Sequence, residues 1–382
     1  MKKKIAILAD FDIAKRPRPF RLAMMLKDKY DICAIARECS FVEGIQCFSF
    51  PAPKTSKDRT EKENQDIINY CKNKEFDKLI YTPNRMVIFD ILKSLPLLDV
   101  IVIEDIALLP FAIEYRKFSP NTKILIDLRE YYPLEYEKDS LWLKSFGVFF
   151  EHLCQKYLPL VDKAIVVNGA IGEKYRNVFG IDVEVFYSFP PFVSLDPSRL
   201  TDTIKIIYHG FLSPDRHSHN LLEIAKNLDK HFCLYVMGLS NQKDYLEDIK
   251  HSAYDITNLK FLPPVDMKDI VTFCNQFDIG ILTLQPNSFN NANALPNKFF
   301  EYIQSRLCVV STPLFEIKKF IDKYKIGRTS EGFDAKDIVQ TLNNMDKKTI
   351  FSYKENASKA SYDLSMNTNI SKIISIIEGL IF

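Results

Sequence analysis

The chain has 382 residues, of which 47% are hydrophobic and 26% charged, so it contains enough apolar material for a soluble globular protein of two domains. Its formal net charge of +2 excludes the strongly basic footprint of a nucleic-acid-binding protein. Eight scattered cysteines without CxxC spacing predict reduced thiols in a cytosolic protein.

The two most apolar stretches early in the chain carry no targeting signal. The opening MKKKIAILAD has too short an apolar run for a secretion signal and predicts a buried strand. The longest apolar stretch, residues 95–113, is interrupted by Asp99, Glu104 and Asp105. We therefore expect no membrane-spanning segment and a cytoplasmic location.

Short β-branched runs alternate with helical patterns through the first half of the chain. Helices are predicted over residues 19–27 and 61–73. Strands are predicted at residues 4–9, 31–36, 78–81, 100–104, 123–128 and 163–167. This alternation is typical of βα units on a parallel sheet.

A proline-rich segment, FPPFVSLDPSRLTDT, then interrupts the periodicity and predicts a linker over residues 190–203. The alternation resumes beyond it, with predicted helices over residues 219–228, 243–251 and 267–275. Strands are predicted at residues 204–209, 232–238, 259–262, 278–283 and 307–312. The closing residues 353–382 predict a polar helix that ends in an apolar segment and reaches beyond its own domain.

The predicted fold class is therefore α/β, with two doubly wound Rossmann-like domains facing a cleft. The domains are predicted at residues 1–189 and 204–352, with residues 353–382 packing back toward the first. Ligands of such sheets bind beyond the carboxyl ends of the strands, so the loops after strands are the places to search.

The segment NALPNKFFEYIQS, residues 293–305, places Lys298 and Glu301 three residues apart after Pro296, which suits a first helical turn. One interpretation is an exposed ion pair, which contributes little stability. The other is a ligand site: helix amides and a lysine bind an anion, and a carboxylate accepts hydroxyl hydrogen bonds. A nucleotide's diphosphate and ribose satisfy the second description.

The stretch NALPNKFFEYIQSRLCVVST resembles the donor-binding segment of retaining GT-B glycosyltransferases of the group 1, or family 4, type, particularly bacterial surface-polysaccharide enzymes. The resemblance implies that Glu301 binds the donor ribose and Lys298 its diphosphate. The first glutamate of the family's E-x7-E motif falls on Asn293. The remaining donor-loop positions fall on Ala294, Leu295, Pro296 and Asn297.

Further segments resemble other donor loops of the same family. In IIYHGFLSPDR, the resemblance implies that Gly210 lets the loop approach the donor and that Arg216 binds phosphate. A plain turn and a solvated charge are the alternatives at these two positions. Gly238 in VMG and Val265 in LPPV correspond to loops that contact the donor and its base.

In the first half, ILIDLREYYP resembles the family's D-x-H-E-Y-F-P segment. It implies catalytic roles for Asp127, Arg129 and Glu130, with Arg129 in place of the family's histidine. An ordinary strand end with charged residues is the alternative. Asp127 or Glu130 would serve as a base if the enzyme inverts configuration.

The resemblance implies transfer of a sugar from a nucleotide-sugar, with UDP as the expected nucleotide, to a glycan or lipid-linked glycan acceptor in surface-polysaccharide synthesis. It implies a retaining reaction without metal or other cofactor, in which Arg216 and Lys298 stabilise the departing diphosphate. Lys15, Arg16 and Arg18 follow the first strand, where they either contact acceptor phosphate or the inner face of the membrane, or form a solvated basic loop.

Other sequence patterns bear on membrane contact, metal binding and alternative functions. The stripe Trp142, Phe146, Phe149, Leu153 and Tyr157 predicts a buried helix face, with peripheral membrane contact as the alternative. The HSH of residues 217–219 lacks further spaced metal ligands, and no GxGxxG follows a strand, which disfavours hydride transfer. A non-catalytic sugar-nucleotide-binding or glycan-binding subunit and a nucleotide-sugar epimerase remain the competing functions.

Overall fold

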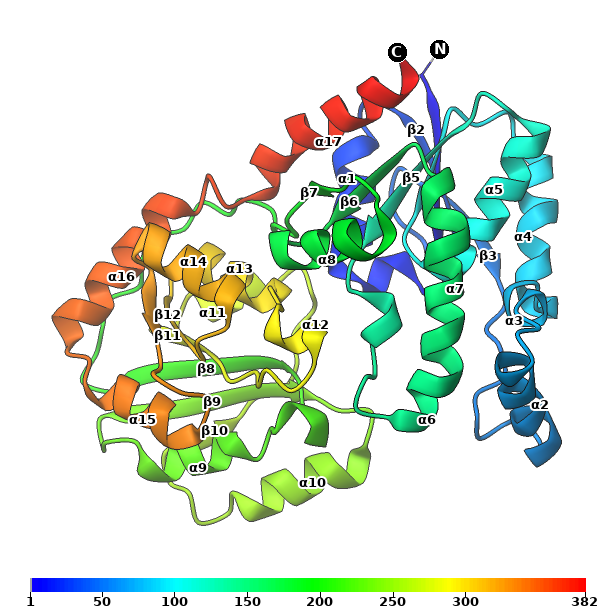
Figure 1. Ribbon diagram of the computed structural model, residues 1–382. Helices are drawn as coiled ribbons and strands as arrows, with labels where there is room; N and C mark the ends of the chain where they lie inside the picture. The colour runs from blue at the N-terminus through cyan, green and yellow to red at the C-terminus, as the bar shows by residue number, and fades with distance from the viewer. Residues whose placement is uncertain (1) are drawn as a thin grey trace. The chain divides into compact units, whose positions relative to one another are not determined.

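The computed structural model describes residues 2–382, apart from the side chain of Asp215, and divides into two compact units. The first unit comprises Met1–Ser188, Ser288–Asn290 and Asn369–Phe382, and the second comprises Phe189–Asn287 and Asn291–Thr368. Each unit contains one parallel sheet with helices on both sides, drawn in Figure 1.

The first sheet has seven strands in the order β3-β2-β1-β4-β5-β6-β7, and every neighbouring pair is parallel. Its strands are β1 Lys4–Ala9, β2 Asp31–Arg37, β3 Gln46–Phe50, β4 Val100–Ile103, β5 Lys123–Leu128, β6 Lys163–Val166 and β7 Glu184–Val185. The order reverses between β1 and β4, because the chain first adds strands on one side of β1 and then on the other. Such a reversal marks the usual ligand-binding edge.

Five of the six strands predicted in this half are confirmed, and the one at residues 78–81 is wrong. Those residues form the short helix α3, in which the Leu79 and Ile80 amides both donate to the Phe76 carbonyl. A short apolar run does not distinguish a strand from a buried helical turn. Conversely, β3 lacks a continuous apolar run and was not predicted.

The helices of the first unit connect successive strands. They are α1 Pro17–Leu26, α2 Glu61–Lys72, α3 Asp77–Ile80, α4 Pro83–Ser94, α5 Leu109–Phe118, α6 Ser140–Trp142, α7 Val148–Tyr157 and α8 Gly169–Phe179. Of the predicted buried stripe, Phe149, Leu153 and Tyr157 are buried on α7, whereas Trp142 and Phe146 lie before this helix and are half-buried.

The second sheet has six parallel strands in the order β10-β9-β8-β11-β12-β13, again with a reversal between its first and fourth strands. They are β8 Ile204–Phe211, β9 Phe232–Leu239, β10 Leu259–Phe261, β11 Ile279–Leu282, β12 Cys308–Ser311 and β13 Gly327–Thr329. All five strands predicted in this half are confirmed, and β13 is additional.

In the second unit α9, α10 and α15 lie on one side of the sheet and α11, α13 and α14 on the other (Figure 1). The helices are α9 Asn220–Asn227, α10 Lys243–Ser252, α11 Ile270–Cys274, α12 Phe289–Ala292, α13 Asn297–Gln304, α14 Phe315–Tyr324, α15 Ala335–Asn343 and α16 Lys347–Ala360. By the division of the chain, α12 begins in the first unit and ends in the second.

The closing segment contains two helices where one was predicted. After α16, a break at residues 361–365 precedes α17, Met366–Ile381. From Asn369 onward α17 belongs to the first unit, where the Asn369 side-chain amide donates to the Tyr187 carbonyl at 2.7 Å and Lys372 Nζ to the Val185 carbonyl at 2.7 Å. The predicted return of the C-terminal helix to the first domain is thus observed.

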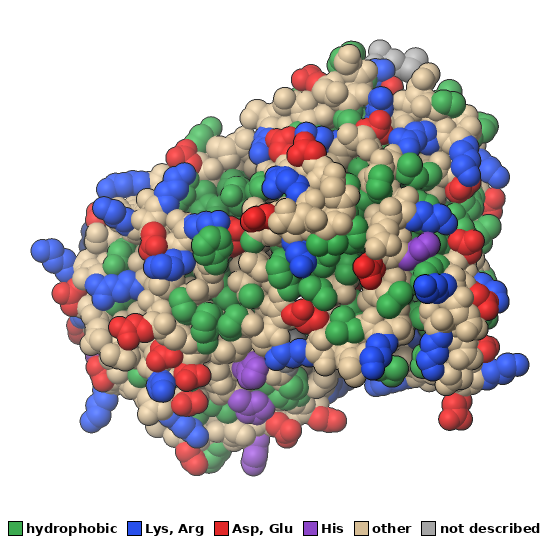
Figure 2. Space-filling view, in the orientation of Figure 1, with side chains coloured by type: hydrophobic (Ala, Val, Ile, Leu, Met, Phe, Trp, Pro, Cys, Tyr) green, Lys and Arg blue, Asp and Glu red, His purple; other side chains and the backbone are tan. Residues whose placement is uncertain are grey.

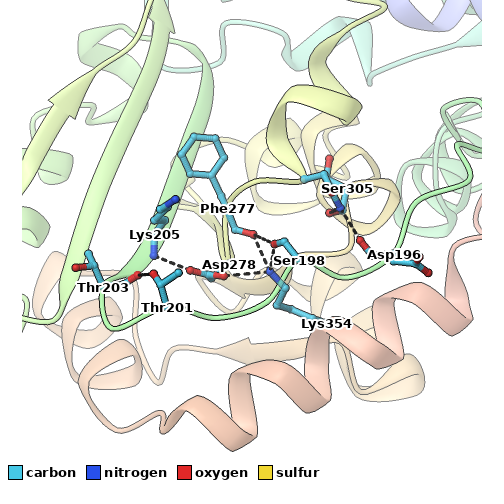
Figure 3. Close-up of polar contacts among 10 residues, drawn as sticks. Asp196, Ser198, Thr201, Thr203, Lys205, Phe277, Asp278, Ser305 and Lys354 are labelled. Carbon is cyan, nitrogen blue, oxygen red and sulfur yellow. Dashed lines mark hydrogen bonds and ion pairs between the residues drawn. The ribbon is translucent and has the colours of Figure 1, made fainter.

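The predicted linker, residues 190–203, has neither helix nor strand, yet buried cations of the second unit hold it in place. Arg306 donates to the carbonyls of Val193 at 2.7 Å and Leu195 at 3.1 Å. Figure 3 shows Lys354 of α16 pointing toward Ser198, and its ammonium donates to the Ser198 hydroxyl at 2.8 Å. The segment is therefore ordered by specific contacts with the second unit.

On the face drawn in Figure 2, acidic and basic side chains are interspersed, so the near-neutral charge of the chain also holds locally there. No helix among residues 2–382 is both long enough and apolar enough to cross a membrane.

Candidate functional site

The carboxyl ends of β8 and β11 separate in the second unit. The two strands pair only at Ile206 with Ile279 and at Ile207 with Gly280, although β8 continues to Phe211. Beyond this point the sheet opens where its strand order reverses. Open α/β sheets bind their ligands at such an opening.

Tyr302 of α13 bridges the separating strands. Its hydroxyl accepts a hydrogen bond from the His209 amide of β8 at 3.2 Å and donates to the Ile281 carbonyl of β11 at 3.3 Å. Gly280 makes room for the ring, since a Cβ at that position would lie 2.3 Å from the Tyr302 Cγ. These contacts fix α13 against the sheet and therefore fix where the helix begins.

The first residues of α13 present an anion-attracting helix end. Pro296 is the N-cap residue of the helix, and its side chain makes no capping hydrogen bond. The dipole of the helix favours a negative ligand at this end. The opposite face of the helix is anchored by the buried rings of Phe299 and Phe300. Lys298 thus stands in the first turn of a helix that its apolar neighbours hold in place.

Lys298 lies directly over the end of β8. Its ammonium is 4.0 Å from the centre of the Tyr208 ring. Gly210 has a φ of +128°, and a Cβ there would be 2.9 Å from Lys298 Nζ. The backbone conformation therefore favours glycine at this position, and a side chain there would displace the lysine ammonium. The plain-turn interpretation of Gly210 does not account for this contact.

A small pocket collects the two cations that the resemblance assigns to phosphate. Arg216 is exposed at the end of a 3-10 turn, Pro214–Arg216, with its guanidinium 5.8 Å from the Phe211 ring. Lys298 lines the same pocket. The full lining is Tyr208, Arg216, Leu282, Thr283, Leu284, Pro296 and Lys298. Two cations beside the start of a helix give this small pocket, of about 30 Å³, the charge that attracts a phosphate oxygen.

Glu301 is buried, which excludes the interpretation of an exposed ion pair with Lys298. Its carboxylate lies 3.6 Å from His209 Nε2. Burial lowers the pKa of His209 to about 4, against the opposing effect of Glu301, so the imidazole is neutral near pH 7. His209 Nε2 has no hydrogen-bond partner among residues 2–382. The pair therefore offers polar atoms to a hydroxyl-bearing ligand without a net positive charge on the histidine.

The other predicted donor residues fall into two groups. Asn293, Ala294, Leu295 and Asn297 are half-buried in the segment that leads into and begins α13. Gly238 pairs in register with Gly210, and a Cβ on it would lie 2.3 Å from Leu212 Cδ1, so packing alone requires glycine there. Val265 is half-buried in the loop after β10 and does not line the small pocket. Donor contacts for these residues stay predictions.

In the first unit the structure contradicts two predicted roles. Arg18 lies on α1 and donates from Nε and Nη2 to the two carboxylate oxygens of Asp127 at 2.6 and 2.8 Å, and from Nη1 to the Phe186 carbonyl at 2.6 Å. Arg18 is 6% exposed and Asp127 is fully buried. Arg18 is therefore neither an acceptor contact nor part of a solvated loop, and Asp127 is not accessible as a base.

The neighbouring predicted residues remain closer to the surface. Arg129 donates from Nε to the Glu104 carbonyl at 3.0 Å, and its guanidinium is 4.5 Å from the Phe11 ring. Glu130 is half-buried. Lys15 is exposed and pairs with Asp12 at 3.3 Å, and Arg16 is exposed. Their predicted catalytic and acceptor roles are compatible with this exposure and stay predictions.

Sequence reasoning missed several polar groups. Burial, reinforced by Asp127, raises the pKa of Glu104 to about 8, and neither of its carboxyl oxygens has a hydrogen-bond partner among the described residues. The Ser213 hydroxyl is also buried and without such a partner in that part of the chain. His209 lies near the carboxyl end of β8, and Glu104 directly follows β4. A titratable residue at the end of a buried apolar strand is the sequence signal that could have indicated both.

Comparison with known proteins gives structural matches only. No protein-family model matches the chain, and no curated protein matches it in sequence. Sucrose-phosphate synthase from Thermosynechococcus elongatus is similar in structure, with a TM-score of 0.75, 10% identity and 99% of each chain covered. Anabaena Alr3699/HepE in complex with UDP-glucose has a TM-score of 0.69 and 12% identity, over 98% of this chain and 99% of that one.

Trehalose-6-phosphate synthase from E. coli, bound with UDP-2-fluoro glucose, matches with a TM-score of 0.66 and 14% identity over 98% of each chain. At these identities the likeness shows the fold. The predicted GT-B fold class, with its two Rossmann-like α/β domains, is confirmed.

Proposed function

We propose that the chain is a glycosyltransferase that moves a sugar from a nucleotide-sugar, with UDP as the nucleotide, to an acceptor hydroxyl. The observation that carries the proposal is the pocket where β8 and β11 separate. There Lys298, Arg216 and the N-terminal end of α13 collect positive charge, while Glu301 supplies a buried carboxylate nearby. A nucleotide diphosphate with its ribose fits this distribution of charge.

The structural neighbours support the choice of ligand. The Anabaena protein was solved with UDP-glucose, and the E. coli synthase with UDP-2-fluoro glucose. Both cover nearly all of this chain. The pocket described above lies at the sheet edge at which such folds bind nucleotides.

The residues also support a chemical role. Cleavage of a sugar–diphosphate bond leaves negative charge on the diphosphate, which Lys298, Arg216 and the α13 amides would stabilise without a metal. Removing one preorganised donor of this kind typically lowers the rate about a hundredfold to a thousandfold. We propose a retaining reaction, as the resemblance implies. The pairing of Asp127 with Arg18 removes one of the two candidate bases of an inverting reaction.

For the biological role we propose synthesis of a bacterial surface polysaccharide such as capsule, O-antigen or exopolysaccharide. The acceptor would be a glycan or lipid-linked glycan, and the protein cytoplasmic or peripheral at the inner face of the membrane. The resemblance of residues 293–312 to such enzymes supports this role.

A second candidate function rests on Asn293, which stands where the resemblance implies a glutamate. A neutral amide at the sugar end of the site favours a subunit that binds a nucleotide-sugar without turning it over. Turnover separates the two functions. A binder would be stabilised by nucleotide yet show neither donor hydrolysis nor sugar transfer.

The proposal is tested by thermal unfolding of the full chain with UDP-, GDP-, ADP- and dTDP-sugars. A ligand at about a hundredfold excess over Kd stabilises the folded state by roughly 2.7 kcal/mol. We expect a UDP-sugar to raise the Tm most and Lys298→Met to lose the shift. Lys336→Met is the matched control, since Lys336 is exposed on α15 and does not line the pocket. Absence of a shift with every nucleotide would refute the proposed donor site.

A further inference from the structure

The first unit contains a cavity of about 690 Å³ that no assignment above uses. Its volume lies within the range of roughly 300–1,000 Å³ typical of small-molecule sites. The lining comes from the ends of β1 and β4, the segment between β3 and α2, and helices α2, α3, α4 and α7. The lining includes charged and aromatic side chains, among them Asp10, Arg59, Tyr70, Tyr81, Arg85 and Phe150.

The cavity lies at the point where the first sheet reverses its strand order. Asp10 directly follows β1, and Asp105 follows Glu104 at the end of β4, so two neighbouring central strands end at this cavity. The carboxyl ends of strands at such a reversal are where open α/β sheets bind ligands. The position is therefore equivalent, within its own sheet, to that of the Lys298 pocket in the second.

Asp10 is held by Arg85 through one oxygen, and its other oxygen makes no hydrogen bond to the described residues. Its Oδ2 accepts a hydrogen bond from Arg85 Nη2, and Arg85 is itself fixed by donating from Nη1 to the Leu79 carbonyl at 3.1 Å. Asp10 Oδ1 is buried and has no hydrogen-bond partner within residues 2–382, although Arg37 Nε lies 3.8 Å away. A fixed carboxylate oxygen of this kind accepts a hydrogen bond from a ligand hydroxyl.

Arg59 is a cation of the cavity wall that forms no ion pair with the described residues. It lies in the segment before α2, and its Nε is buried without a hydrogen-bond partner among the described residues. No acidic side chain in that part of the chain forms an ion pair with its guanidinium. A buried donor left unpaired costs free energy, and the planar guanidinium matches a phosphate or carboxylate with two parallel hydrogen bonds.

Aromatic rings form much of the remaining wall. Tyr70 comes from α2, Tyr81 follows α3, and Phe149 and Phe150 come from α7. Flat apolar surface beside a few fixed polar groups is the usual composition of a ligand pocket. A sugar ring has apolar C–H faces and a polar edge, so it fits such a wall while its hydroxyls reach Asp10.

A second cavity in the same unit, of about 670 Å³, has no comparable groups. Its Lys117 is paired with Glu114 at 2.7 Å. Among the residues that the structure describes, it contributes no buried polar side-chain atom without a hydrogen-bond partner. The unsatisfied atoms of the first unit's pockets thus concentrate at Asp10 and Arg59.

We propose that the cavity at Asp10 and Arg59 binds a sugar that carries an anionic group, either phosphate or carboxylate. Asp10 accepts a hydroxyl hydrogen bond, Arg59 binds the anionic group, and the aromatic rings contact the sugar faces. Binding at this cavity stands on the first unit alone. Its assignment as the acceptor site rests on the proposed transferase function, and it then specifies an anionic acceptor sugar.

The test is isothermal titration calorimetry of the full chain with glucose, glucose 6-phosphate, glucuronate and inorganic phosphate as probes. We expect one of the two charged sugars to bind more tightly than glucose and than phosphate alone, and the tighter one identifies the anionic group. Because hydrogen bonds to charged groups are strong, we expect Arg59→Gln to lower the affinity for the charged sugar by roughly tenfold to a hundredfold. The affinity for glucose should stay unchanged. Asp10→Asn should weaken every sugar probe.

Lys57→Gln is the matched control, because Lys57 is an exposed cation in the same segment but does not line the cavity. UDP binding is measured on every variant and should not change. Equal affinity for charged and neutral sugars, no binding of any sugar, or charged-sugar binding that survives Arg59→Gln and Asp10→Asn would each overturn the proposal. If the wild-type chain did not bind UDP, that result would instead refute the proposed donor site.

Discussion

The ammonium of Lys298 occupies the space that a side chain at position 210 would need: a Cβ on Gly210 would lie 2.9 Å from Lys298 Nζ and 3.2 Å from Cε. The two residues are far apart in sequence, and both come from segments assigned to the donor site. A larger residue at position 210, next to the last residue of β8, would have to displace the lysine.

Gly210→Ala should therefore weaken nucleotide binding as well as stability. The substitution is strained at a φ of +128° and moves Lys298. We expect a loss of stability of about 1 kcal/mol or more and a clear rise in the Kd for UDP. Gly180→Ala is the control, because Gly180 also has a positive φ, +67°, but open space around it. It should lose stability and keep UDP binding, and equal UDP binding by both variants would contradict the assigned contact.

Glu301→Gln tests the ribose contact. The change keeps the shape of the side chain and removes the charge that strengthens a hydrogen bond from a ribose hydroxyl. Wild type should bind UDP more tightly than 2′,3′-dideoxyuridine diphosphate, by roughly tenfold for a charged hydrogen bond. The variant should lose most of that preference in calorimetry. If both proteins discriminate equally, Glu301 does not contact the ribose.

The neutral state of His209 predicts a loss of stability in acid. Its pKa in the folded protein is about 4, against about 6.5 in the unfolded chain. Below pH 6.5 the unfolded state therefore binds the proton first, and stability falls until the folded histidine also protonates near pH 4. The full effect is about 3 kcal/mol.

Urea unfolding at intervals from pH 7 to 4 measures this effect against His209→Gln. The variant lacks the titrating group, so its stability relative to wild type should rise steadily as the pH falls from 6.5 to 4. A constant difference between the two proteins across that range would show that His209 is not held neutral.

Glu104 should act in the opposite direction. Burial, with Asp127 nearby, raises its pKa to about 8, above the usual value of 4.5. Stability from the protonated carboxyl is complete below pH 4.5 and is lost as the pH rises through 8. Glu104→Gln stays neutral, so we expect it to match wild type near pH 4 and to exceed it in stability at pH 8–9. Denaturant unfolding at both pH values decides the matter, and a variant that is less stable at pH 9 would contradict the protonated state.

Lys354→Met should destabilise the second unit strongly. The buried ammonium donates to Asp278 at 3.1 Å, to the Phe277 carbonyl at 2.8 Å and to Ser198, as Figure 3 shows. Removing the ammonium breaks these hydrogen bonds and leaves the buried Asp278 carboxylate without its countercharge. We expect this to lower the free energy of unfolding by about 3–5 kcal/mol. Combining the change with Asp278→Asn should recover part of the loss. Unfolding free energies of the single and double variants provide the measurement, and additive losses would argue against the pair.

The sequence by itself determined most strands and indicated the segments that we propose for donor binding. Runs such as residues 100–103 and 204–209 are apolar and β-branched, and a local pattern of this kind constrains the backbone wherever the segment is buried. Residues 78–81 show the limit of this reasoning, since the same short apolar run forms a helical turn. The break between α16 and α17 was missed because no proline marks it, and α17 changes units there.

Only the tertiary structure decided which polar groups meet. Arg18 and Asp127 are separated by 109 positions, and their pairing depends on α1 packing over the end of β5. Likewise, Lys298 reaches Gly210 because Tyr302 fixes α13 where β8 and β11 separate. Local patterns report burial and periodicity, whereas charge pairing, pKa shifts and unsatisfied donors arise from contacts between distant segments. For that reason the sequence indicated which loops to propose for donor binding, and the folded chain alone revealed Asp10 and Arg59 as neighbours on one cavity.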